Sequence, residues 1–218
     1  MEVKSVAILG AGNGGITAAA DLKSRGFEVR LYELPQFKES FEVWKKAGCI
    51  NLIRNGKSEL TYPDLYTVDA KEAIEGADIV MFTINSTLTE LFTEISAPII
   101  SSDQIILFNG AAAMSSIRFL KKAREMGITK EFKLAELASL TYATRVFPDR
   151  ATAEMSLYTK AIWFTAYPSR YTKEYIVPCR QIYDCLEPAE NLWRIFLENG
   201  NPEVHPGPAL LNAGRIDY

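Results

Sequence analysis

The sequence is short of the residues from which metal sites are built. Among its 218 residues are three cysteines and one histidine, and no two cysteines stand in a CxxC spacing. A usual zinc site takes four such ligands in closely spaced pairs, so we expect no metal site. The preferred interpretation of Cys49, Cys179 and Cys185 is therefore reduced, buried thiols.

Long apolar runs and clustered charges of one sign are also lacking. No run approaches the roughly 18 apolar residues that cross a bilayer, and the formal net charge is −3, with lysine and arginine dispersed along the chain. We therefore expect neither a membrane nor a nucleic acid as a partner. The first residues enter an apolar segment without a signal-peptide pattern, so the expected location is the cytoplasm. With 48% hydrophobic residues, the chain is long enough to bury a sizeable core.

What the sequence does have is a glycine pattern near its N-terminus. A short apolar run leads into Gly10-x-Gly12-x-x-Gly15, and a helix-forming segment follows. Gly10 allows a tight turn out of a strand, Gly12 lets the backbone approach a pyrophosphate, and Gly15 lets the helix pack closely on the sheet. The helix N-terminus favours phosphate because its unpaired N–H groups and the positive end of its dipole face the anion. This order predicts a dinucleotide-binding turn, with Asn13 and Gly14 inside it.

An acidic residue follows where dinucleotide-binding folds hold a ribose. The predicted helix 16–25 ends at Gly26, and a predicted strand 27–32 runs directly into Glu33. A carboxylate there accepts hydrogen bonds from both hydroxyls of the adenosine ribose and repels the extra phosphate of NADP. Glu33 therefore favours NAD as the cofactor, with NADP as the alternative. Without the glycines, the same residue would be interpreted as a solvated strand end.

Strands and helices then alternate along the chain. The predicted elements are a helix 36–47, a hairpin 50–62 around Asn55-Gly56, a helix 70–75, a strand 79–84, a helix 88–95, a strand 104–108 and a helix 114–126. Such alternation predicts right-handed crossovers and a parallel sheet covered on both faces. Later runs rich in β-formers predict further strands, some antiparallel, at 133–137, 142–146, 152–157 and 161–167, before a helix 173–183. The predicted fold class is α/β: a Rossmann-type, doubly wound, mostly parallel sheet with antiparallel additions, followed by the beginning of an all-α domain.

Two segments that directly follow later predicted strands would lie at the same edge of the sheet as the glycine turn. The segment 83–87 includes Asn85, and the segment 109–112 includes Asn109 and Gly110. Small and amide-bearing side chains suit the passage of a nicotinamide ribose, so we expect these residues to line the cofactor cleft. A strand-to-helix turn with an Asn or Ser helix cap would have the same sequence.

The residue pattern of the sequence changes at residues 186–188. This change predicts that residues 1–186 form a dinucleotide-binding domain and that residues 187–218 begin a helical substrate domain. A predicted helix 190–197 is followed by a proline-rich stretch that carries the only histidine, His205. A histidine near a domain junction can polarise a carbonyl and exchange its proton near neutral pH, as hydride transfer to C=O or C=N requires. An exposed loop histidine is the alternative interpretation.

Several motifs, in order along the whole chain, resemble those of the octopine/nopaline (opine) dehydrogenase family. They are Gly10-x-Gly12-Asn13-Gly14-Gly15, Asn109-Gly110-Ala111, Glu136 with Tyr142-Ala143-Thr144-Arg145, and Asn201-Pro202-x-x-His205-Pro206 with Leu210-Leu211-Asn212-Ala213-Gly214-Arg215. The last is the most specific, because the other features also occur in glycerol-3-phosphate dehydrogenases and 2-dehydropantoate reductases.

This resemblance implies an NAD(P)-dependent oxidoreductase acting on CH–NH bonds. An amino acid would attack a 2-oxo acid such as pyruvate, and the resulting imine would take a hydride from NAD(P)H. The resemblance assigns His205 as the catalytic acid/base and implies a substrate-positioning role for Asn201. Arg145 would meet a substrate carboxylate, with a structural ion pair as the alternative.

The family continues past this point into a mostly helical substrate domain, so the chain is expected to hold only the start of that domain. We expect small-molecule substrates as partners, and either a homodimer or an association with the remaining C-terminal portion. Two other functions stay open. One is a 2-hydroxy-acid or glycerol-3-phosphate-like dehydrogenase, which needs no amine substrate, and the other is a dinucleotide-binding module without chemistry of its own.

Overall fold

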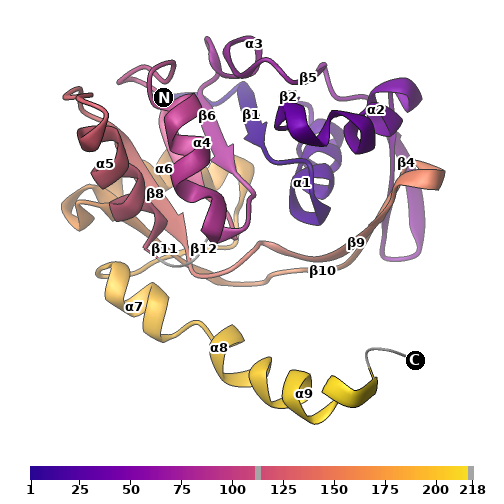
Figure 1. Cartoon of the computed structure of the whole chain (residues 1–218). Helices are drawn as coiled ribbons and strands as arrows, with labels where there is room; N and C mark the ends of the chain where they lie inside the picture. The colour runs from indigo at the N-terminus through magenta and orange to yellow at the C-terminus, as the bar shows by residue number, and fades with distance from the viewer. Residues whose placement is uncertain (111–113, 216–218) are drawn as a thin grey trace.

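A computed structural model describes residues 1–110 and 114–215 and contains a large, mostly parallel sheet (Figure 1). Its eight strands lie in the order β12-β11-β8-β7-β6-β1-β2-β5. They are β1 (Ser5–Leu9), β2 (Glu28–Tyr32), β5 (Leu65–Thr67), β6 (Ile79–Phe82), β7 (Ile105–Phe108), β8 (Lys133–Leu137), β11 (Ile162–Tyr167) and β12 (Leu186–Pro188). Strand β11 runs antiparallel to β8, and the other neighbouring pairs are parallel. The predicted doubly wound α/β class is therefore confirmed.

Helices cover both faces of this sheet because successive strand residues point to opposite sides. Ile79 and Met81 of β6 face one hydrophobic cluster, whereas Val80 and Phe82 face another. Helices α1 (Asn13–Ser24) and α6 (Thr172–Ile182) contribute to the first cluster. Helices α3 (Ala70–Ile74), α4 (Thr89–Ser96) and α5 (Ser115–Glu125) contribute to the second.

A second, four-stranded sheet lies against α1 on the side away from the large sheet (Figure 1). Its order is β4-β3-β10-β9, and its strands are β3 (Ile50–Arg54), β4 (Lys57–Thr61), β9 (Tyr142–Phe147) and β10 (Thr152–Tyr158). The first two form the hairpin predicted around Asn55-Gly56. Because sheets flank α1 on two sides, every residue from Gly15 to Leu22 is buried. Helix α2 (Lys38–Ala47) packs Phe41 and Trp44 into the hydrophobic cluster to which α1 and α6 contribute.

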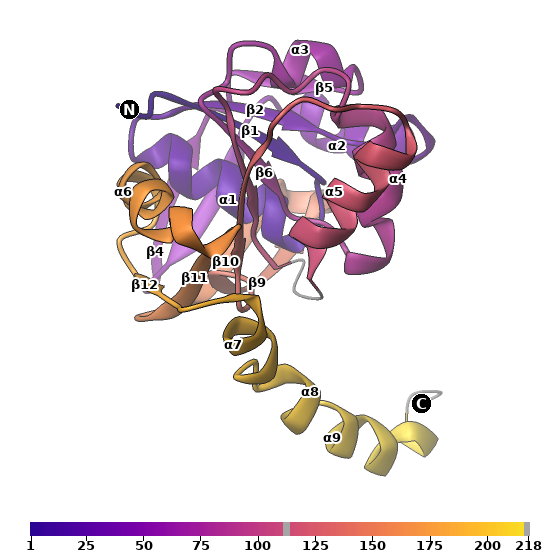
Figure 2. The same ribbon diagram turned by 90° about the vertical axis from the view of Figure 1, so that its left-hand side faces the viewer.

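The C-terminal segment forms short helices that run away from the body (Figure 2). These are α7 (Leu192–Leu197), α8 (Asn201–Val204) and α9 (Pro206–Leu211). Helix α7 is attached to the large sheet by buried Leu192 and Ile195, and the guanidinium of Arg194 lies 4.2 Å from the ring centre of Trp163 on β11. The side chains of α9 are exposed. Within the described residues, no helix is long and apolar enough to cross a membrane.

Two strands were not predicted, and both are three residues long. Strand β5 extends the large sheet beyond β2, and β12 adds its opposite edge. The change of residue pattern at 186–188 therefore falls on an edge strand. The division of the chain into two domains stays a prediction. Short 3-10 turns complete the chain at η1 (Pro35–Phe37), η2 (Ser86–Leu88), η3 (Pro148–Arg150), η4 (Ser169–Tyr171) and η5 (Ala213–Arg215).

Candidate functional site

The turn between β1 and α1 lies at the carboxyl edge of the large sheet, and two of its glycines are required by packing. Gly10 has a φ of +101°, and a Cβ there would lie 2.9 Å from the carbonyl oxygen of Thr83. A Cβ on Gly15 would lie 1.7 Å from the carbonyl oxygen of Gly10. The hydroxyl of Thr83 donates to that same oxygen at 2.9 Å. These contacts bring α1 against β1 as closely as the glycine pattern predicts.

Gly12 differs, because none of the described residues occupies the space beside it. It is exposed, its φ of −75° is ordinary, and a Cβ there would have no neighbour within 4 Å. Gly12 is also the N-cap of α1, a helix end that has neither a side-chain cap nor an acidic residue in its first turn. An uncapped helix N-terminus presents N–H groups and a positive dipole end to an anion. The open face at Gly12 can therefore admit a phosphate.

Asn13 and Gly14, which were predicted to contact a cofactor, have partners within the protein. The side-chain oxygen of Asn13 accepts a hydrogen bond from the backbone N–H of Val146 at 2.8 Å, which ties β9 to the start of α1. A Cβ on Gly14 would lie 2.9 Å from Cδ1 of Leu140. Both residues therefore shape the turn, whether or not they also meet a ligand.

Glu33 lies beside the glycine turn, as its place after β2 predicts. Its carboxylate accepts hydrogen bonds from the backbone N–H of Ala11 at 2.8 Å and from that of Leu34 at 2.7 Å. The side chain is only partly buried, and a carboxylate has about four acceptor sites. Glu33 can thus hold the turn and still accept hydrogen bonds from vicinal hydroxyls.

Asn85 has the helix-cap geometry that its sequence left open. It is exposed, and its side-chain oxygen accepts from the backbone N–H of Thr87 at 3.1 Å and from the Thr87 hydroxyl at 3.0 Å. These bonds cap the turn η2. A contact of Asn85 with a cofactor stays a prediction.

Asn109 is placed differently from the prediction that its side chain lines the cleft. The residue is completely buried. Its amide nitrogen donates to the Tyr183 hydroxyl at 3.2 Å, and its oxygen accepts from the backbone and hydroxyl of Thr141 at 3.1 and 3.0 Å. Because the side-chain amide forms its hydrogen bonds with groups in the protein interior, Asn109 holds the turn after β7 from the interior side. Gly110, with a φ of +91°, is exposed in this turn, and Ala111 and Ala112 lie outside the described residues.

Two polar groups from the predicted motifs are structural. Buried Glu136 accepts from the backbone N–H groups of Ser115 and Ser116, each at 3.1 Å, and therefore holds the N-terminus of α5. The Tyr142 hydroxyl donates to buried Asp21 of α1 at 3.0 Å. Burial raises the pKa of Tyr142 well above its usual value, so this group stays protonated and fastens β9 to α1.

Arg145 lies on β9, directly before the residue that binds Asn13. Its side chain is exposed, and its register partner on β10 is Glu154. Within the part of the chain that the structure describes, no ion pair joins Arg145 to a carboxylate. The alternative of a structural ion pair is therefore not seen there, and a role with a substrate carboxylate stays a prediction.

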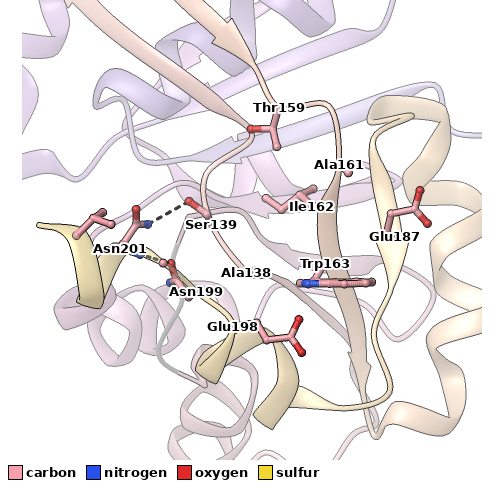
Figure 3. A pocket seen from close by; sticks show the side chains of 12 residues that line it. Ala138, Ser139, Thr159, Ala161, Ile162, Trp163, Glu187, Glu198, Asn199 and Asn201 are labelled. Atoms are coloured by element: carbon pink, nitrogen blue, oxygen red, sulfur yellow. Dashed lines mark hydrogen bonds between the residues drawn. The ribbon is translucent and has the colours of Figure 1, made fainter.

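A cavity of about 540 Å³ lies where α7 and α8 approach the carboxyl end of β8 (Figure 3). Trp163 and Ile162 provide an apolar wall, and Glu187 and Glu198 lie at its edge. Asn201 reaches across it, and its amide nitrogen donates to the Ser139 hydroxyl at 3.2 Å. Ser139 was not predicted as a site residue, because a lone serine after a strand has no distinctive pattern.

His205 is exposed at the junction of α8 and α9, one residue after Val204, which lines this cavity. Among the described residues, none forms a hydrogen bond with its imidazole. The glycine turn, Glu33 and Gly110 thus lie on one edge of the sheet, and Asn201 is tied to that edge through Ser139. The backbone N–H of His205 donates to the carbonyl oxygen of Asn201 at 3.1 Å, but no side-chain interaction joins His205 or Arg145 to this edge in the described part of the chain.

The sheet order, the crossovers and the open glycine turn define a Rossmann-type fold. No protein-family model matches the chain. It is 27% identical over 218 residues to an opine dehydrogenase of Arthrobacter sp. (strain 1C), which covers the whole of this chain and 59% of that protein. This similarity confirms the resemblance predicted from the motifs.

Solved structures agree on the fold. An octopine dehydrogenase with NADH and L-arginine superposes with a TM-score of 0.74 at 20% identity, over 99% of this chain and 55% of its own. A yersinopine dehydrogenase with NADP⁺ gives a TM-score of 0.78 at 15% identity, over 96% of this chain and 53% of its own. The chain therefore spans little more than half the length of these three dehydrogenases.

Proposed function

We propose that this chain binds NAD(H) and is the cofactor-binding part of an opine-type dehydrogenase. One observation carries the proposal: Gly12 leaves open space over an uncapped helix N-terminus, and the Glu33 carboxylate lies next to the same turn. A pyrophosphate fits the first feature and a ribose fits the second. The matched octopine and yersinopine dehydrogenases hold NADH and NADP⁺ respectively, which supports a nicotinamide dinucleotide as the ligand.

Glu33 favours NAD over NADP for an electrostatic reason. A carboxylate that accepts hydrogen bonds from the ribose hydroxyls repels a phosphate on one of them. The candidate pyrophosphate contacts are the backbone of Gly10, Gly12 and Gly15, with Asn13 and Gly14 supporting the turn.

The proposed reaction joins an amino acid to a 2-oxo acid. The amino nitrogen attacks the keto carbon, water leaves, and the resulting imine accepts one hydride and one proton to give a secondary amine. NADH held by the glycine turn and Glu33 would supply the hydride. We assign His205 as the group that exchanges the proton, which is a role suited to imidazole near neutral pH, and Arg145 as a partner for a substrate carboxylate.

The cavity beside Asn201 supports a place for the organic substrates next to the cofactor half of the fold. It combines the apolar surface of Trp163 with the amides of Asn199 and Asn201, a mixture typical of small-molecule sites. In this proposal residues 1–186 bind the cofactor, and residues 187–218 begin the part that holds the amino acid and the 2-oxo acid.

The proposal is tested by following NADH oxidation with pyruvate, with and without a pool of amino acids. This chain and any longer product of the same gene are assayed together, because the relatives are longer. Oxidation that requires amino acids is the expected result. Oxidation without them would instead assign an enzyme that reduces a 2-oxo acid to an alcohol, and binding without turnover in either polypeptide would leave a dinucleotide-binding module.

The variant His205→Asn tests the catalytic assignment in whichever polypeptide turns over. We expect turnover to fall about a hundredfold, because general acid–base catalysis contributes on that scale. The dissociation constant for NADH should stay within about twofold, since His205 lies outside the glycine turn. Unchanged turnover would refute the role of His205.

A further inference from the structure

Leu140 contacts both glycine turns at the carboxyl edge of the large sheet. It lies three residues beyond the end of β8 at Leu137. Cβ atoms built on Gly14 and Gly110 would lie 2.9 and 3.2 Å from its Cδ1. The isobutyl group therefore fills the space between the turn after β1 and the turn after β7. It is only partly buried, so one side of it remains open at this edge.

The order of the strands shows which half of a dinucleotide would reach Leu140. In the large sheet, β1 lies between β2 on one side and β6, β7 and β8 on the other. A dinucleotide lies across this switch point, with its pyrophosphate at the first turn and one nucleoside over each half. Glu33 follows β2 and marks the adenosine half. Leu140 follows β8 and therefore belongs to the opposite half.

On this basis we propose that Leu140 is the apolar surface against which the nicotinamide ring lies. The inference rests on the proposed NAD(H) function and extends it to the orientation of the ring. Its neighbours Gly14 and Gly110 have no side chains, and the Asn109 amide is engaged in the interior, so Leu140 supplies the branched apolar group between these two turns. A saturated side chain gives a flat ring dispersion contact over its whole face.

The contact should also bind the two redox forms of the cofactor with different affinities. The reduced ring is neutral, whereas the oxidised ring carries a positive charge that an apolar wall cannot solvate. Leu140 should therefore stabilise NADH more than NAD⁺. A residue that only kept the two glycine turns apart would affect every ligand of the pyrophosphate turn equally, because Gly14 belongs to that turn.

The test compares the binding of NADH, NAD⁺ and ADP-ribose, which lacks the nicotinamide ring, by isothermal titration calorimetry on this chain. Leu140→Ala removes most of the side chain, and Leu140→Asn keeps four heavy atoms branched at Cγ but makes the end of the side chain polar. Leu157→Ala is the matched control, because Leu157 is an exposed leucine on β10. We expect both Leu140 variants to weaken NADH binding about fivefold or more, as loss of buried apolar contact does. ADP-ribose binding should stay within about twofold.

The inference is further supported if the Leu140 variants lose more affinity for NADH than for NAD⁺. Equal weakening of all three ligands would overturn the inference and leave Leu140 as a spacer between the turns, and unchanged NADH binding in both variants would overturn it as well. Should Leu140→Ala fail to fold, Leu140→Asn and Leu140→Met give the same comparison, with the methionine variant expected to retain NADH affinity. A wild-type chain that binds neither NADH nor ADP-ribose would refute the proposed function itself.

Discussion

Substituting alanine for Gly12 or for Gly15 should separate cofactor binding from folding. The two glycines are three residues apart in one turn, yet their surroundings are opposite. A Cβ on Gly12 would have no neighbour within 4 Å among residues 1–110 and 114–215, whereas a Cβ on Gly15 would lie 1.7 Å from the carbonyl oxygen of Gly10. The first variant should therefore lose the ligand, and the second should lose stability.

The expected magnitudes follow from these distances. A carbon–oxygen contact needs about 3.3 Å, so Gly15→Ala must move α1 away from β1 by about 1.6 Å and should cost about 3 kcal/mol or more. For a chain of this size that lowers Tm by about 10 °C. Gly12→Ala loses about 0.5 kcal/mol as a poorer N-cap and regains a similar amount by restricting the unfolded chain. Its free energy of unfolding should therefore stay within about 0.5 kcal/mol of wild type.

The binding assay reverses the order of the two variants. The Gly12→Ala methyl group stands in the space open to the pyrophosphate, and loss of a charged hydrogen bond costs about 1.5–3 kcal/mol. We expect the dissociation constant for NADH, measured by fluorescence titration, to rise at least about tenfold. Urea unfolding of the same samples supplies the stability comparison. Wild-type NADH affinity in Gly12→Ala would refute the position of the pyrophosphate, and wild-type stability in Gly15→Ala would refute the packing of α1 on β1.

Three further predictions concern charge and burial. Glu33→Gln should narrow the preference for NADH over NADPH, as the ratio of the two dissociation constants measures, and a wild type that already prefers NADPH would contradict the role of Glu33. Asp21→Ala should cost about 2 kcal/mol in urea unfolding, because it removes the buried carboxylate that accepts from Tyr142, Arg25 and Arg54. The exposed Asp149→Ala is the control, and equal stability of the two variants would argue against the Asp21 network. Burial raises the folded-state pKa of Tyr142 and Tyr183 above the unfolded value of about 10, so their stabilising contribution is complete below pH 10 and is lost as the pH rises further. Unfolding experiments between pH 8 and 11 should show that loss in wild type and less of it in Tyr142→Phe; a flat profile would exclude the linkage.

Much of the fold could be predicted because its information is local. The alternation of apolar runs with helical segments gave the parallel sheet, and Asn55-Gly56 gave the hairpin of β3 and β4. Strands β5 and β12 escaped prediction because three residues are too few for a period to be recognised. The parallel pairing of β3 with β10 joins segments about 100 residues apart, and nothing in either segment specifies the other.

The candidate site likewise has a part that the sequence predicted and a part that it did not. The glycine turn and Glu33 are close in sequence, and the pattern predicted that they lie together, as the hydrogen bond from the Ala11 N–H to the Glu33 carboxylate shows; their roles with a cofactor stay predictions. Asn109 was expected at the cleft, but its neighbours Thr141 and Tyr183 come from distant segments and draw its amide inward. Leu140 is inconspicuous in the sequence and becomes notable only when two turns meet around it.

The enclosure of α1 between two sheets has a consequence for its dynamics. Buried on both sides from Gly15 to Leu22, the helix cannot fray or shift without opening both hydrophobic layers, so its amides should exchange with deuterium only through global unfolding. The end of this helix proposed to bind phosphate is therefore preorganised, and association with an anion there should require little loss of conformational entropy. Mass-spectrometric hydrogen exchange should find α1 equally protected with and without NADH, while the exposed α9 exchanges freely in both samples.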